Sequence, residues 1–348
     1  MMKKIIVIGG AGFIGTNLVI SAIKRGCDVV IFDNLSRPGT NLNLDYIKSL
    51  NIGNFDFLRG DIRNKSELEV LFEKHGDCDA IFHFAAQVAV TTSVENPSND
   101  FEINAMGAIN ILETMRIKNI SSPIIYTSTN KVYGKMSNVV IKENNSSYSY
   151  EDFPKGISEK FPLEFYSPYG CSKGSADQYF LDYSRIFGIK SIVFRQSCIY
   201  GYNQFGIEDQ GWVAWFTIAA MFEKPITIFG DGKQVRDVLF ISDLVDAYWL
   251  AIKNIDKTNG QAYNIGGGPE FSMSLLELIE FLEDFFEKQI SVDFSKSRPG
   301  DQLVYISDID KARKDFKWNP LINPREGVKK LVNWCQNNRE LFIKSGII

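Results

Sequence analysis

Short apolar runs alternate with amphipathic stretches of helix length over the first two thirds of the chain. These runs are KKIIVIGG (3–10), DVVIFDN (28–34), FDFLRGD (55–61), DAIFHFAA (79–86), PIIYTST (123–129) and IKSIVFRQS (189–197). Runs rich in Val, Ile and Phe, separated by helical segments, are typical of βαβ units whose parallel strands are buried on both faces. The pattern therefore predicts an α/β fold with a doubly wound parallel sheet and right-handed crossovers.

The alternation breaks after Ser197. The segments GYNQFGIEDQGWVAWF (201–216) and PITIFGDGKQVRDV (225–238) mix glycines, aromatic residues and charges, and a helical pattern resumes near Ser242. A chain of this length exceeds the usual size of a single core, so we expect two lobes. The predicted boundaries are 1–196 with 235–267 for the larger lobe, and 197–234 with 268–348 for the smaller, C-terminal one.

Composition narrows the class of ligand. The chain has 348 residues, a formal net charge of -4 and a pI near 5.5, and its basic residues are scattered. This balance argues against nucleic acid or an anionic membrane as a partner, so we expect a small-molecule ligand. No apolar run approaches the ~20 residues that span a bilayer, and the one at the N-terminus is too short for an export signal.

Cysteines and histidines show no spacing typical of disulfides or metal sites, which predicts a cytoplasmic, metal-free protein. They are Cys27, Cys78, Cys171, Cys198, Cys335, His75 and His83.

A glycine-rich segment, VIGGAGFIGTNL (7–18), follows the first predicted strand and begins the first predicted helix. Gly10, Gly12 and Gly15 match the GxGxxG dinucleotide fingerprint, and Gly9, Gly12 and Gly15 match the wider GxxGxxG spacing equally well. Glycines at these positions allow a tight turn and let the backbone approach a pyrophosphate at a helix N-terminus, where free N–H groups favour anions. This context predicts a Rossmann lobe that binds a dinucleotide.

Acidic residues at the next strand ends refine this prediction. Asp33 ends the second predicted strand, where a carboxylate binds the adenosine ribose diol and repels a 2′-phosphate, so we expect NAD rather than NADP. Arg37 lies nearby and is the one residue that argues for a phosphate. Asp61 follows the third strand, either beside adenine or as a helix N-cap. Small residues at Ala85 and Ala86 let a flat cofactor pass, and we expect His83 to be a packing residue.

A tyrosine and a lysine lie four positions apart in SPYGCSKGSADQYF (167–180). Ser167 is predicted to be the N-cap and Pro168 the first helical residue, so Tyr169 and Lys173 share one helix face. An ammonium group near a phenol lowers its pKa, which lets the phenol oxygen accept a proton while a hydride leaves the substrate carbon. TSTNKVYG (127–134) ends the fifth strand and supplies the Thr129 hydroxyl to orient the reacting oxygen.

With these motifs, the chain resembles the extended short-chain dehydrogenase/reductase family of nucleotide-sugar epimerases and dehydratases over nearly all its length. The resemblance implies a Rossmann lobe that binds NAD and a smaller lobe that binds a sugar nucleotide. It implies that the catalytic residues are Thr129, Tyr169 and Lys173. It implies that NAD contacts Gly9, Gly12, Phe13, Ile14, Asp33, Asn34, Ser36, Arg37, Asp61, Ile62, Ala85, Ala86, Gln87, Asn104, Thr127, Tyr169, Lys173 and Ser197.

One position departs from the dehydratases of this family, which carry an Asp-Glu pair directly after the threonine. Here Asn130 and Lys131 follow Thr129. Neither side chain can act as the carboxylic acid that protonates a leaving hydroxyl, so the sequence argues against dehydration.

Narrower stretches are similar to the subgroup that epimerises carbon 2 of CDP-3,6-dideoxyhexoses: QVAVTTSVENP, STNKVYG, PYGCSKGSADQY, LDYSRIFG and GIEDQGWVAWF. This similarity implies substrate contacts at Gln87, Thr129, Asn130, Lys131, Cys198, Arg236, Arg298 and Asp301. Guanidinium groups suit phosphate oxygens, whereas cytosine as the base rests on the resemblance alone. Epimerisation at carbon 4 of another nucleotide sugar, or a catalytically silent NAD-binding sensor or scaffold, are the alternatives.

The family commonly forms dimers or tetramers through a four-helix bundle, and the resemblance implies a homo-oligomer here. The helices concerned are those near 99–118 and 169–187, the second of which carries the predicted catalytic pair.

Overall fold

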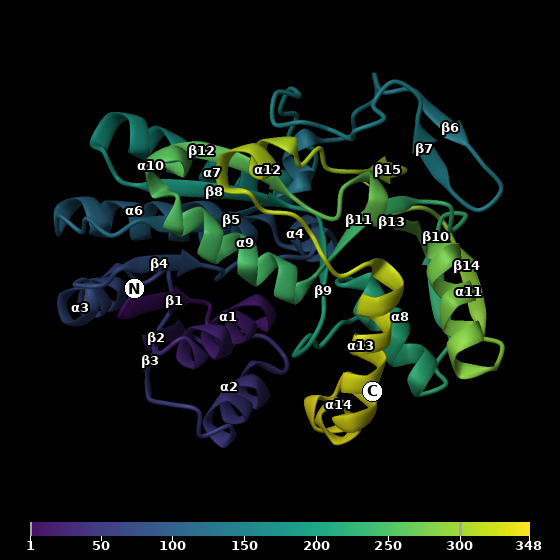
Figure 1. The fold of residues 1–348 in the computed structure, drawn as a ribbon, viewed down its shortest axis with the longest axis horizontal. Helices are drawn as coiled ribbons and strands as arrows, with labels where there is room; N and C mark the ends of the chain where they lie inside the picture. The colour runs from purple at the N-terminus through teal and green to yellow at the C-terminus, as the bar shows by residue number, and fades with distance from the viewer. Residues whose placement is uncertain (1, 299–300) are drawn as a thin grey trace.

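A computed structural model describes residues 2–298 and 301–348. Its centre is a seven-stranded parallel sheet in the order β12-β8-β5-β4-β1-β2-β3 (Figure 1). The strands are β1 (Lys4–Ile8), β2 (Asp28–Asp33), β3 (Phe55–Arg59), β4 (Ala80–His83), β5 (Ile124–Thr129), β8 (Ser191–Gln196) and β12 (Gln261–Ile265). Every neighbouring pair in this sheet runs parallel, which confirms the predicted fold class.

Helices cover both faces of the sheet because successive strand residues point to opposite sides. Ile5 and Val7 of β1 pack in the core with α1 (Phe13–Lys24), α2 (Thr40–Ser49) and α9 (Ile241–Lys253). Ile6 and Ile8 pack on the other face, where the helices are α3 (Lys65–His75), α6 (Gly107–Ile117) and α7 (Pro168–Phe187). The sheet is therefore doubly wound, as the continuous apolar runs predict.

A second group of elements lies at the right of the view in Figure 1, beyond the carboxyl ends of the sheet strands. Its main sheet joins β13, β11 and β15, and β9 pairs with β11. The strands are β9 (Cys198–Tyr200), β10 (Ile226–Phe229), β11 (Val235–Phe240), β13 (Ser272–Ser274), β14 (Val292–Ser295) and β15 (Val304–Tyr305). The helices here are α8 (Trp212–Met221), α11 (Leu275–Phe286), α13 (Pro324–Asn337) and α14 (Arg339–Ser345).

The remaining elements are short. They are α4 (Val90–Glu95), α5 (Pro97–Phe101), the π-helical turn η1 (Glu102–Met106), the 3-10 turns η2 (Asn130–Tyr133) and η3 (Pro269–Phe271), the hairpin β6 (Ile141–Glu143) and β7 (Tyr148–Tyr150), α10 (Ile255–Thr258) and α12 (Asp310–Phe316). Within 235–267, β12 joins the central sheet while β11 pairs with β9, β13 and β15. The division into two lobes stays a prediction.

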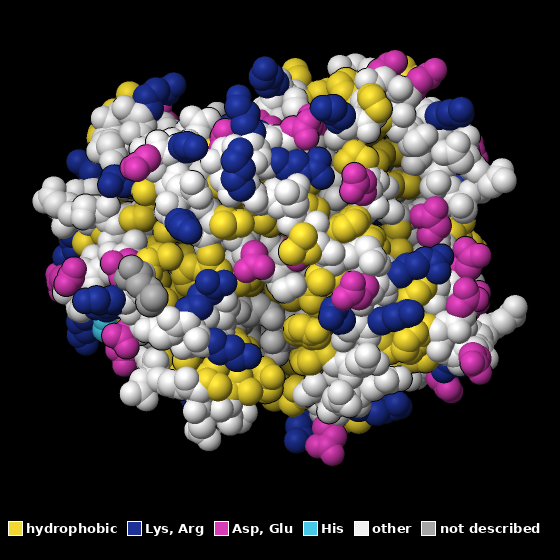
Figure 2. Space-filling model, viewed as in Figure 1, with side chains coloured by type: hydrophobic (Ala, Val, Ile, Leu, Met, Phe, Trp, Pro, Cys, Tyr) yellow, Lys and Arg dark blue, Asp and Glu magenta, His cyan; other side chains and the backbone are white. Residues whose placement is uncertain are grey.

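Charged side chains of both signs are interspersed over the face shown in Figure 2, with apolar side chains between them. Every helix in the described part of the chain is too short or too polar to cross a membrane. Within residues 2–298 and 301–348, His, Cys, Asp and Glu side chains form no group of three that could hold a metal ion.

Candidate active site

The glycine-rich turn between β1 and α1 brings two backbone segments into close contact. Gly9 has a positive φ of 81°, and a Cβ on it would lie 2.4 Å from the backbone nitrogen of Ala85. A Cβ on Gly15 would lie 2.2 Å from the carbonyl oxygen of Gly9. Any side chain at either position would force the turn apart. Gly12 is the N-cap of α1 and has no side chain to cap it, so the first N–H groups of the helix can bind an anion.

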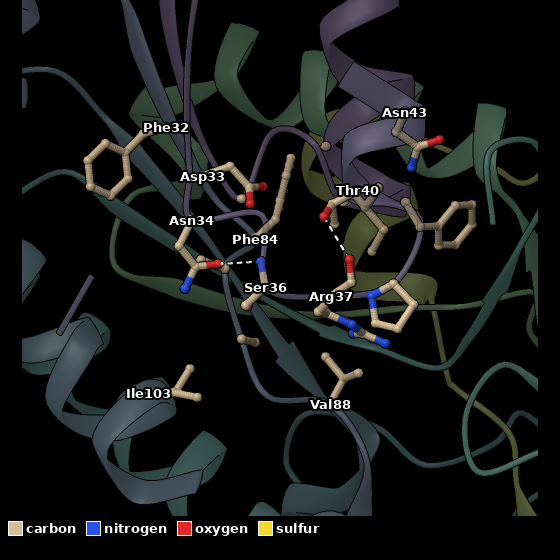
Figure 3. Close-up of a pocket in the computed structure, with 18 of the residues that line it drawn as sticks. Phe32, Asp33, Asn34, Ser36, Arg37, Thr40, Asn43, Phe84, Val88 and Ile103 are labelled. Atoms are coloured by element: carbon tan, nitrogen blue, oxygen red, sulfur yellow. Dashed lines mark hydrogen bonds between the residues drawn. The ribbon is translucent and has the colours of Figure 1, made fainter. Parts of the chain in front are cut away.

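These glycines lie in one pocket with most of the residues predicted to bind NAD (Figure 3). The predicted residues that line it are Gly9, Gly12, Phe13, Ile14, Asp33, Asn34, Ser36, Arg37, Asp61, Ile62, Ala85 and Ala86. The pocket thus combines a backbone cradle for a pyrophosphate with a carboxylate at the end of β2. Its residues fit NAD.

Asp33 is buried, and its two oxygens already accept backbone hydrogen bonds. Ala11 N donates to Oδ2 at 3.0 Å and Leu35 N donates to Oδ1 at 2.8 Å. Burial raises the pKa of Asp33, and these two bonds oppose that change. A carboxylate has about four acceptor positions, so a ribose diol can still be bound. The contacts fix the carboxylate where it faces the pocket (Figure 3).

Asp61 is not a helix N-cap, because Asn64 caps α3 by accepting from Ser66 N. Instead Asp61 accepts from Asn34 Nδ2 at 2.9 Å and from Arg63 Nη2 at 2.8 Å. The hydrogen bond from Arg63 is the main reason that its pKa falls to about 2. Asp61 is therefore an ionised residue in the wall of the pocket, and hydrogen bonds from Asn34 and Arg63 hold its carboxylate in place. The alternative prediction, that Asp61 is a helix N-cap, is wrong.

Arg37 reaches across to the second group of elements. Its Nη2 donates to Gln210 Oε1 at 3.1 Å, and its carbonyl oxygen accepts from Thr40 Oγ1 at 2.7 Å (Figure 3). Ser36 N donates to Asn34 Oδ1 at 3.0 Å in the same turn. The guanidinium of Arg37 thus has a neutral amide partner from the loop before α8.

The catalytic helix begins as the sequence predicts. Ser167 Oγ accepts from Gly170 N at 3.0 Å, and Pro168 is the first residue of α7. This start places Tyr169 and Lys173 in the first turns, where both side chains are buried. Thr129, at the end of β5, lies beside the phenol of Tyr169 and acts to lower its pKa. The three predicted catalytic residues therefore lie together.

The electrostatics of this trio differ from the sequence-based expectation. Burial raises the pKa of Tyr169 to about 12, and the hydrogen bond from Thr129 is the largest opposing effect. Burial also lowers the pKa of Lys173 to about 7, although the charges of Asp100 and Asp177 oppose it. Burial is the largest influence on the pKa of both Tyr169 and Lys173. Lys173 is therefore not a permanently charged ammonium group, and it does not lower the pKa of the phenol as the sequence predicts.

Lys173 is held from the sheet side. Its Nζ donates to the carbonyl oxygen of Thr127 at 2.5 Å and lies 4.3 Å from the ring centroid of Tyr126. His83 packs against the rings of Tyr126 and Phe180, which stack on each other, and burial lowers its pKa to about 3. The neutral imidazole is therefore a packing residue, which confirms that prediction.

A second pocket extends from Tyr169 into the smaller group of elements. Of the predicted substrate residues, it is lined by Thr129, Asn130, Lys131, Cys198, Arg236, Arg298 and Asp301. Val88 and Gln210 line both pockets, so the two pockets adjoin, and Tyr169 lines the second. A cofactor in the first pocket can therefore face a substrate in the second.

Three cationic side chains and Asp301 form the far part of this second pocket. Arg236 Nη2 lies 2.6 Å from Asp301 Oδ1, and Lys131 Nζ lies 3.5 Å from the same oxygen. Burial alone would raise the pKa of Asp301, but the charges of Arg236 and Lys131 lower it overall. Pro299 and Gly300, between Arg298 and Asp301, lie outside the described residues.

Arg298 is fixed by the loop before α8. Its Nη2 lies 2.9 Å from Asp209 Oδ1, both terminal nitrogens donate to the carbonyl oxygen of Glu208 at 3.3 Å, and its guanidinium carbon is 3.8 Å from the ring centroid of Phe229. A flat guanidinium stacked on an aromatic ring and presented to a pocket suits a phosphate or a nucleotide base.

Several predicted residues lie outside the linings of both pockets. They are Gln87, Asn104, Thr127, Lys173 and Ser197. Gln87 and Asn104 bind each other, with Asn104 Oδ1 accepting from Gln87 N at 2.9 Å. Ser197 Oγ donates to the carbonyl oxygen of Asp237 at 3.0 Å. These side chains therefore belong to the structure around the site and do not line either pocket.

Sequence reasoning missed part of the wall between the pockets. Asn203, Gln204, Phe205 and Gln210 line the first pocket, although they follow β9 in the smaller group. Trp212 lines the second pocket and donates from Nε1 to Cys198 Sγ at 3.3 Å. The mixed glycine-aromatic segment 201–216 was the available signal, because loops of this kind commonly carry binding residues.

A dinucleotide cradle next to a pocket that contains Thr129 and Tyr169, with Lys173 buried one turn further along α7, defines an NAD-dependent enzyme of the short-chain dehydrogenase/reductase type. Comparison with known proteins agrees with this class. The chain belongs to the NAD dependent epimerase/dehydratase family, which it matches over residues 5–266. Within that family it is an isomerase, a nucleotide-sugar epimerase.

Relatives match nearly the whole chain. CDP-paratose 2-epimerase of Salmonella typhi is 46% identical over 339 residues, which cover 96% of this chain and 99% of that protein. A putative UDP-glucose 4-epimerase of Methanocaldococcus jannaschii is 33% identical over 335 residues, with the same coverage of 96% and 99%.

Solved structures agree in fold. UDP-glucose 4-epimerase of Thermotoga maritima, determined with UDP-glucose, has a TM-score of 0.82 at 29% identity and covers 97% of this chain and 99% of that chain. UDP-glucuronic acid 4-epimerase of Bacillus cereus, determined with UDP-glucuronic acid and NAD, has a TM-score of 0.82 at 28% identity, with coverage of 96% and 99%.

Proposed function

We propose that this enzyme converts CDP-paratose to CDP-tyvelose by NAD-dependent epimerisation at carbon 2 through a transient keto sugar. The observation that carries the proposal is the 46% identity to CDP-paratose 2-epimerase along nearly the full chain, together with Thr129 and Tyr169 in the second pocket. The reaction would belong to the cytoplasmic biosynthesis of 3,6-dideoxyhexoses for lipopolysaccharide O-antigen.

The trio supplies the proton chemistry. Tyr169, as its phenolate, accepts the proton of the 2-hydroxyl, and Thr129 beside it orients the reacting oxygen. NAD, when bound, takes the hydride from carbon 2 and returns it to the opposite face after the keto sugar has turned over. Tyr169 then returns the proton to the new hydroxyl, so the alcohol, the cofactor and the phenolate all end in their starting states.

Direct oxidation at carbon 2 follows from the chemistry of the substrate. Inversion through an enol would need a ketone at carbon 3, and a 3-deoxy sugar has no oxygen there. The side chains after Thr129 agree with this route, because Asn130 and Lys131 offer no carboxylic acid for elimination of water. Epimerisation by hydride removal and return needs only the proton acceptor and the cofactor.

The nucleotide half would lie at the cationic end of the second pocket. Arg236 and Arg298 suit the diphosphate oxygens, and Asp301 suits the nucleotide ribose. Under this proposal residues 1–196 with 235–267 hold NAD, and residues 197–234 with 268–348 hold the sugar nucleotide, while the loop 203–210 contributes to both pockets.

A second candidate is epimerisation at carbon 4 of a UDP-sugar. It is favoured by the 33% identity to a putative UDP-glucose 4-epimerase and by the same trio, which acts equally well on a 4-hydroxyl. A panel of CDP-, UDP- and GDP-sugars, assayed for isomerisation, separates the two. Complete inactivity of the NAD-loaded protein on the panel would instead favour a silent NAD-binding protein.

The fate of the hydrogen on carbon 2 tests the mechanism. CDP-paratose with deuterium at carbon 2 should give CDP-tyvelose that keeps the deuterium, and unlabelled substrate in heavy water should gain none there. A base-driven inversion does the reverse, because a proton removed from carbon exchanges with solvent. Solvent deuterium at carbon 2, measured by NMR, would contradict the hydride mechanism.

A crossover experiment adds a check. Deuterated substrate is mixed with undeuterated substrate that carries a heavy-isotope label in the nucleotide, and the products are separated by mass. Deuterium in products with the heavy nucleotide would show that reduced cofactor carries it between substrate molecules. Its absence would show that each keto sugar is reduced by the hydride that it gave up.

A further inference from the structure

A buried carboxylate lies behind the catalytic pair. Asp100, in the short helix α5, is only 1% exposed. It approaches the site from a different element than any of the predicted catalytic residues. A buried carboxylate is costly to keep unless its oxygens are fully hydrogen-bonded, so its partners show what it holds in place.

The partners of Asp100 come from two sides of the site. Its Oδ2 accepts from Ser172 Oγ at 2.5 Å, in the residue next to Lys173. Its Oδ1 accepts from Gln87 Nε2 at 3.0 Å and from Asn104 Nδ2 at 3.1 Å. The carboxylate thus joins the first turns of α7, which carry Tyr169 and Lys173 and are called the catalytic turn below, to the segment that follows β4.

The partners of Asp100 are also hydrogen-bonded to one another. Asn104 Nδ2 also donates to Ser172 Oγ at 3.1 Å and to the carbonyl oxygen of Gln87 at 3.0 Å. Asn104 lies in the π-helical turn η1, and single π-helical turns occur mostly where a helix must re-aim side chains at a functional site. Here the turn aims the Asn104 amide at the carboxylate and at the catalytic helix.

Besides its hydrogen bonds, Asp100 contributes a negative charge that acts on the catalytic pair. The hydrogen-bond partners recorded for it are neutral, whereas Asp177, the other carboxylate that acts on Lys173, is paired with Arg195 through two bonds of 2.9 Å. Arg195 therefore compensates the charge of Asp177. The charge of Asp100 is left to act on the catalytic pair.

We propose that Asp100 is a positioning residue of the active site: its carboxylate locks the catalytic turn of α7 against Gln87 and Asn104, and its negative charge acts on Lys173 and Tyr169. This inference rests on the proposed catalytic roles of those two residues. It adds a residue that neither the motifs nor the pocket linings identify.

The charge acts on both catalytic groups in the same direction. The field of Asp100 raises the pKa of Lys173, against burial, and contributes to the raised pKa of Tyr169. The other groups that act on Lys173 are Asp177 and the π-face of Tyr126, and His83 beside it is neutral. Those that act on Tyr169 are Thr129 and Arg37. All of these stay in place when only Asp100 is changed.

The test is Asp100→Asn, which keeps the size of the side chain and removes its charge. The profile of log kcat against pH should move to lower pH by about one unit, because both groups lose the same negative neighbour. Asp182→Asn is the matched control, since Asp182 is partly exposed on α7 and paired with Arg185. Its profile should coincide with that of the wild type.

If the profile of log kcat against pH is not shifted in Asp100→Asn, the proposal is wrong, whether kcat itself is normal or reduced. A carboxylate with a purely structural role would leave the titration of Lys173 and Tyr169 unchanged. If the wild type itself fails to turn over CDP-paratose, that result counts against the proposed function, and the profile is then measured on whichever nucleotide sugar the panel identifies. The two failures are therefore distinguishable.

A second variant covers the case in which Asp100→Asn does not fold. Ser172→Ala keeps the charge of Asp100 and removes the 2.5 Å bond to the catalytic turn, together with the bond that Ser172 Oγ accepts from Asn104. We expect kcat to fall about tenfold with the pH profile in place and the melting temperature close to that of the wild type. A wild-type kcat for Ser172→Ala would contradict the positioning role.

Discussion

The ammonium group of Lys173 lies over the ring of Tyr126, with Nζ 4.3 Å from the ring centroid. The ring face and the carbonyl oxygen of Thr127 stabilise the charge at this buried position. Even so, burial lowers the pKa of Lys173 to about 7. The lysine therefore changes protonation near neutral pH, and the surrounding structure controls that change.

This burial predicts a stability effect for Lys173→Met. Because the folded-state pKa lies below the unfolded value, the unfolded chain binds more protons between about pH 7 and 10, and wild-type stability rises with pH across that window. Methionine removes the desolvation cost but leaves the Thr127 carbonyl without its donor, so we expect a net gain of about 1 to 3 kcal/mol at pH 6.

The measurement is the melting temperature of cofactor-free protein from pH 6 to 9. The variant should melt above the wild type at pH 6, and the difference should shrink as pH rises, while turnover is lost. A variant that melts below the wild type at every pH would show that the contacts of Lys173 outweigh its burial.

Tyr169→Phe should keep NAD bound and lose most turnover. The ring packs as before, but the proton acceptor is gone, and groups of this kind typically contribute about 10²- to 10⁴-fold in rate. Steady-state kcat and NAD titration measure the two properties separately. Tyr179→Phe is the control, because Tyr179 is exposed on the same helix. Near-normal activity of Tyr169→Phe would remove this residue from its role.

Asp33→Asn should weaken NAD and relax the discrimination against NADP. The amide loses the repulsion of a 2′-phosphate and one acceptor, which corresponds to about a 10- to 100-fold loss in NAD affinity. Dissociation constants for both cofactors, measured by calorimetry, give the ratio. Asp45→Asn, on the exposed surface of α2, should change neither constant. An unchanged ratio would mean that another residue, with Arg37 the first candidate, distinguishes the two cofactors.

Oligomerisation through α6 and α7 is a further prediction. These helices carry exposed apolar side chains at Ile117, Tyr179, Ile186 and Phe187, which a second copy would cover. Ile186→Glu should therefore convert a dimer or tetramer to a monomer of 39.4 kDa in analytical ultracentrifugation. Ile343→Glu, an equally exposed isoleucine on α14, is the control. A wild-type monomer, or an Ile186→Glu variant with unchanged mass, would contradict this interface.

Local chemistry explains why the sequence predicts the fold and the start of the catalytic helix. Apolar runs specify the buried strands, and the Ser167-Pro168 pair specifies where α7 begins, because capping depends on adjacent residues only. The glycine-rich turn is equally local. Its motif therefore indicates both the cradle and the helix that follows it.

Contacts between distant segments explain what the sequence does not predict. Arg37 meets Gln210 only because the loop before α8 folds back onto the cofactor pocket. Asp100 meets Ser172 only because η1 turns α5 toward α7. The raised pKa of Tyr169 depends on burial from several elements, which residue spacing does not reveal.

The path of the chain between its two main sheets has a consequence for protein engineering. β8 ends at Gln196 in the central sheet and β9 starts at Cys198 in the other, so a single residue, Ser197, joins them. The chain returns to the central sheet with β12 and leaves it again for β13. A chimera that exchanges residues 197–234 and 268–348 with those of a relative therefore needs three junctions, and the one at Ser197 must preserve a hydroxyl that bonds to Asp237.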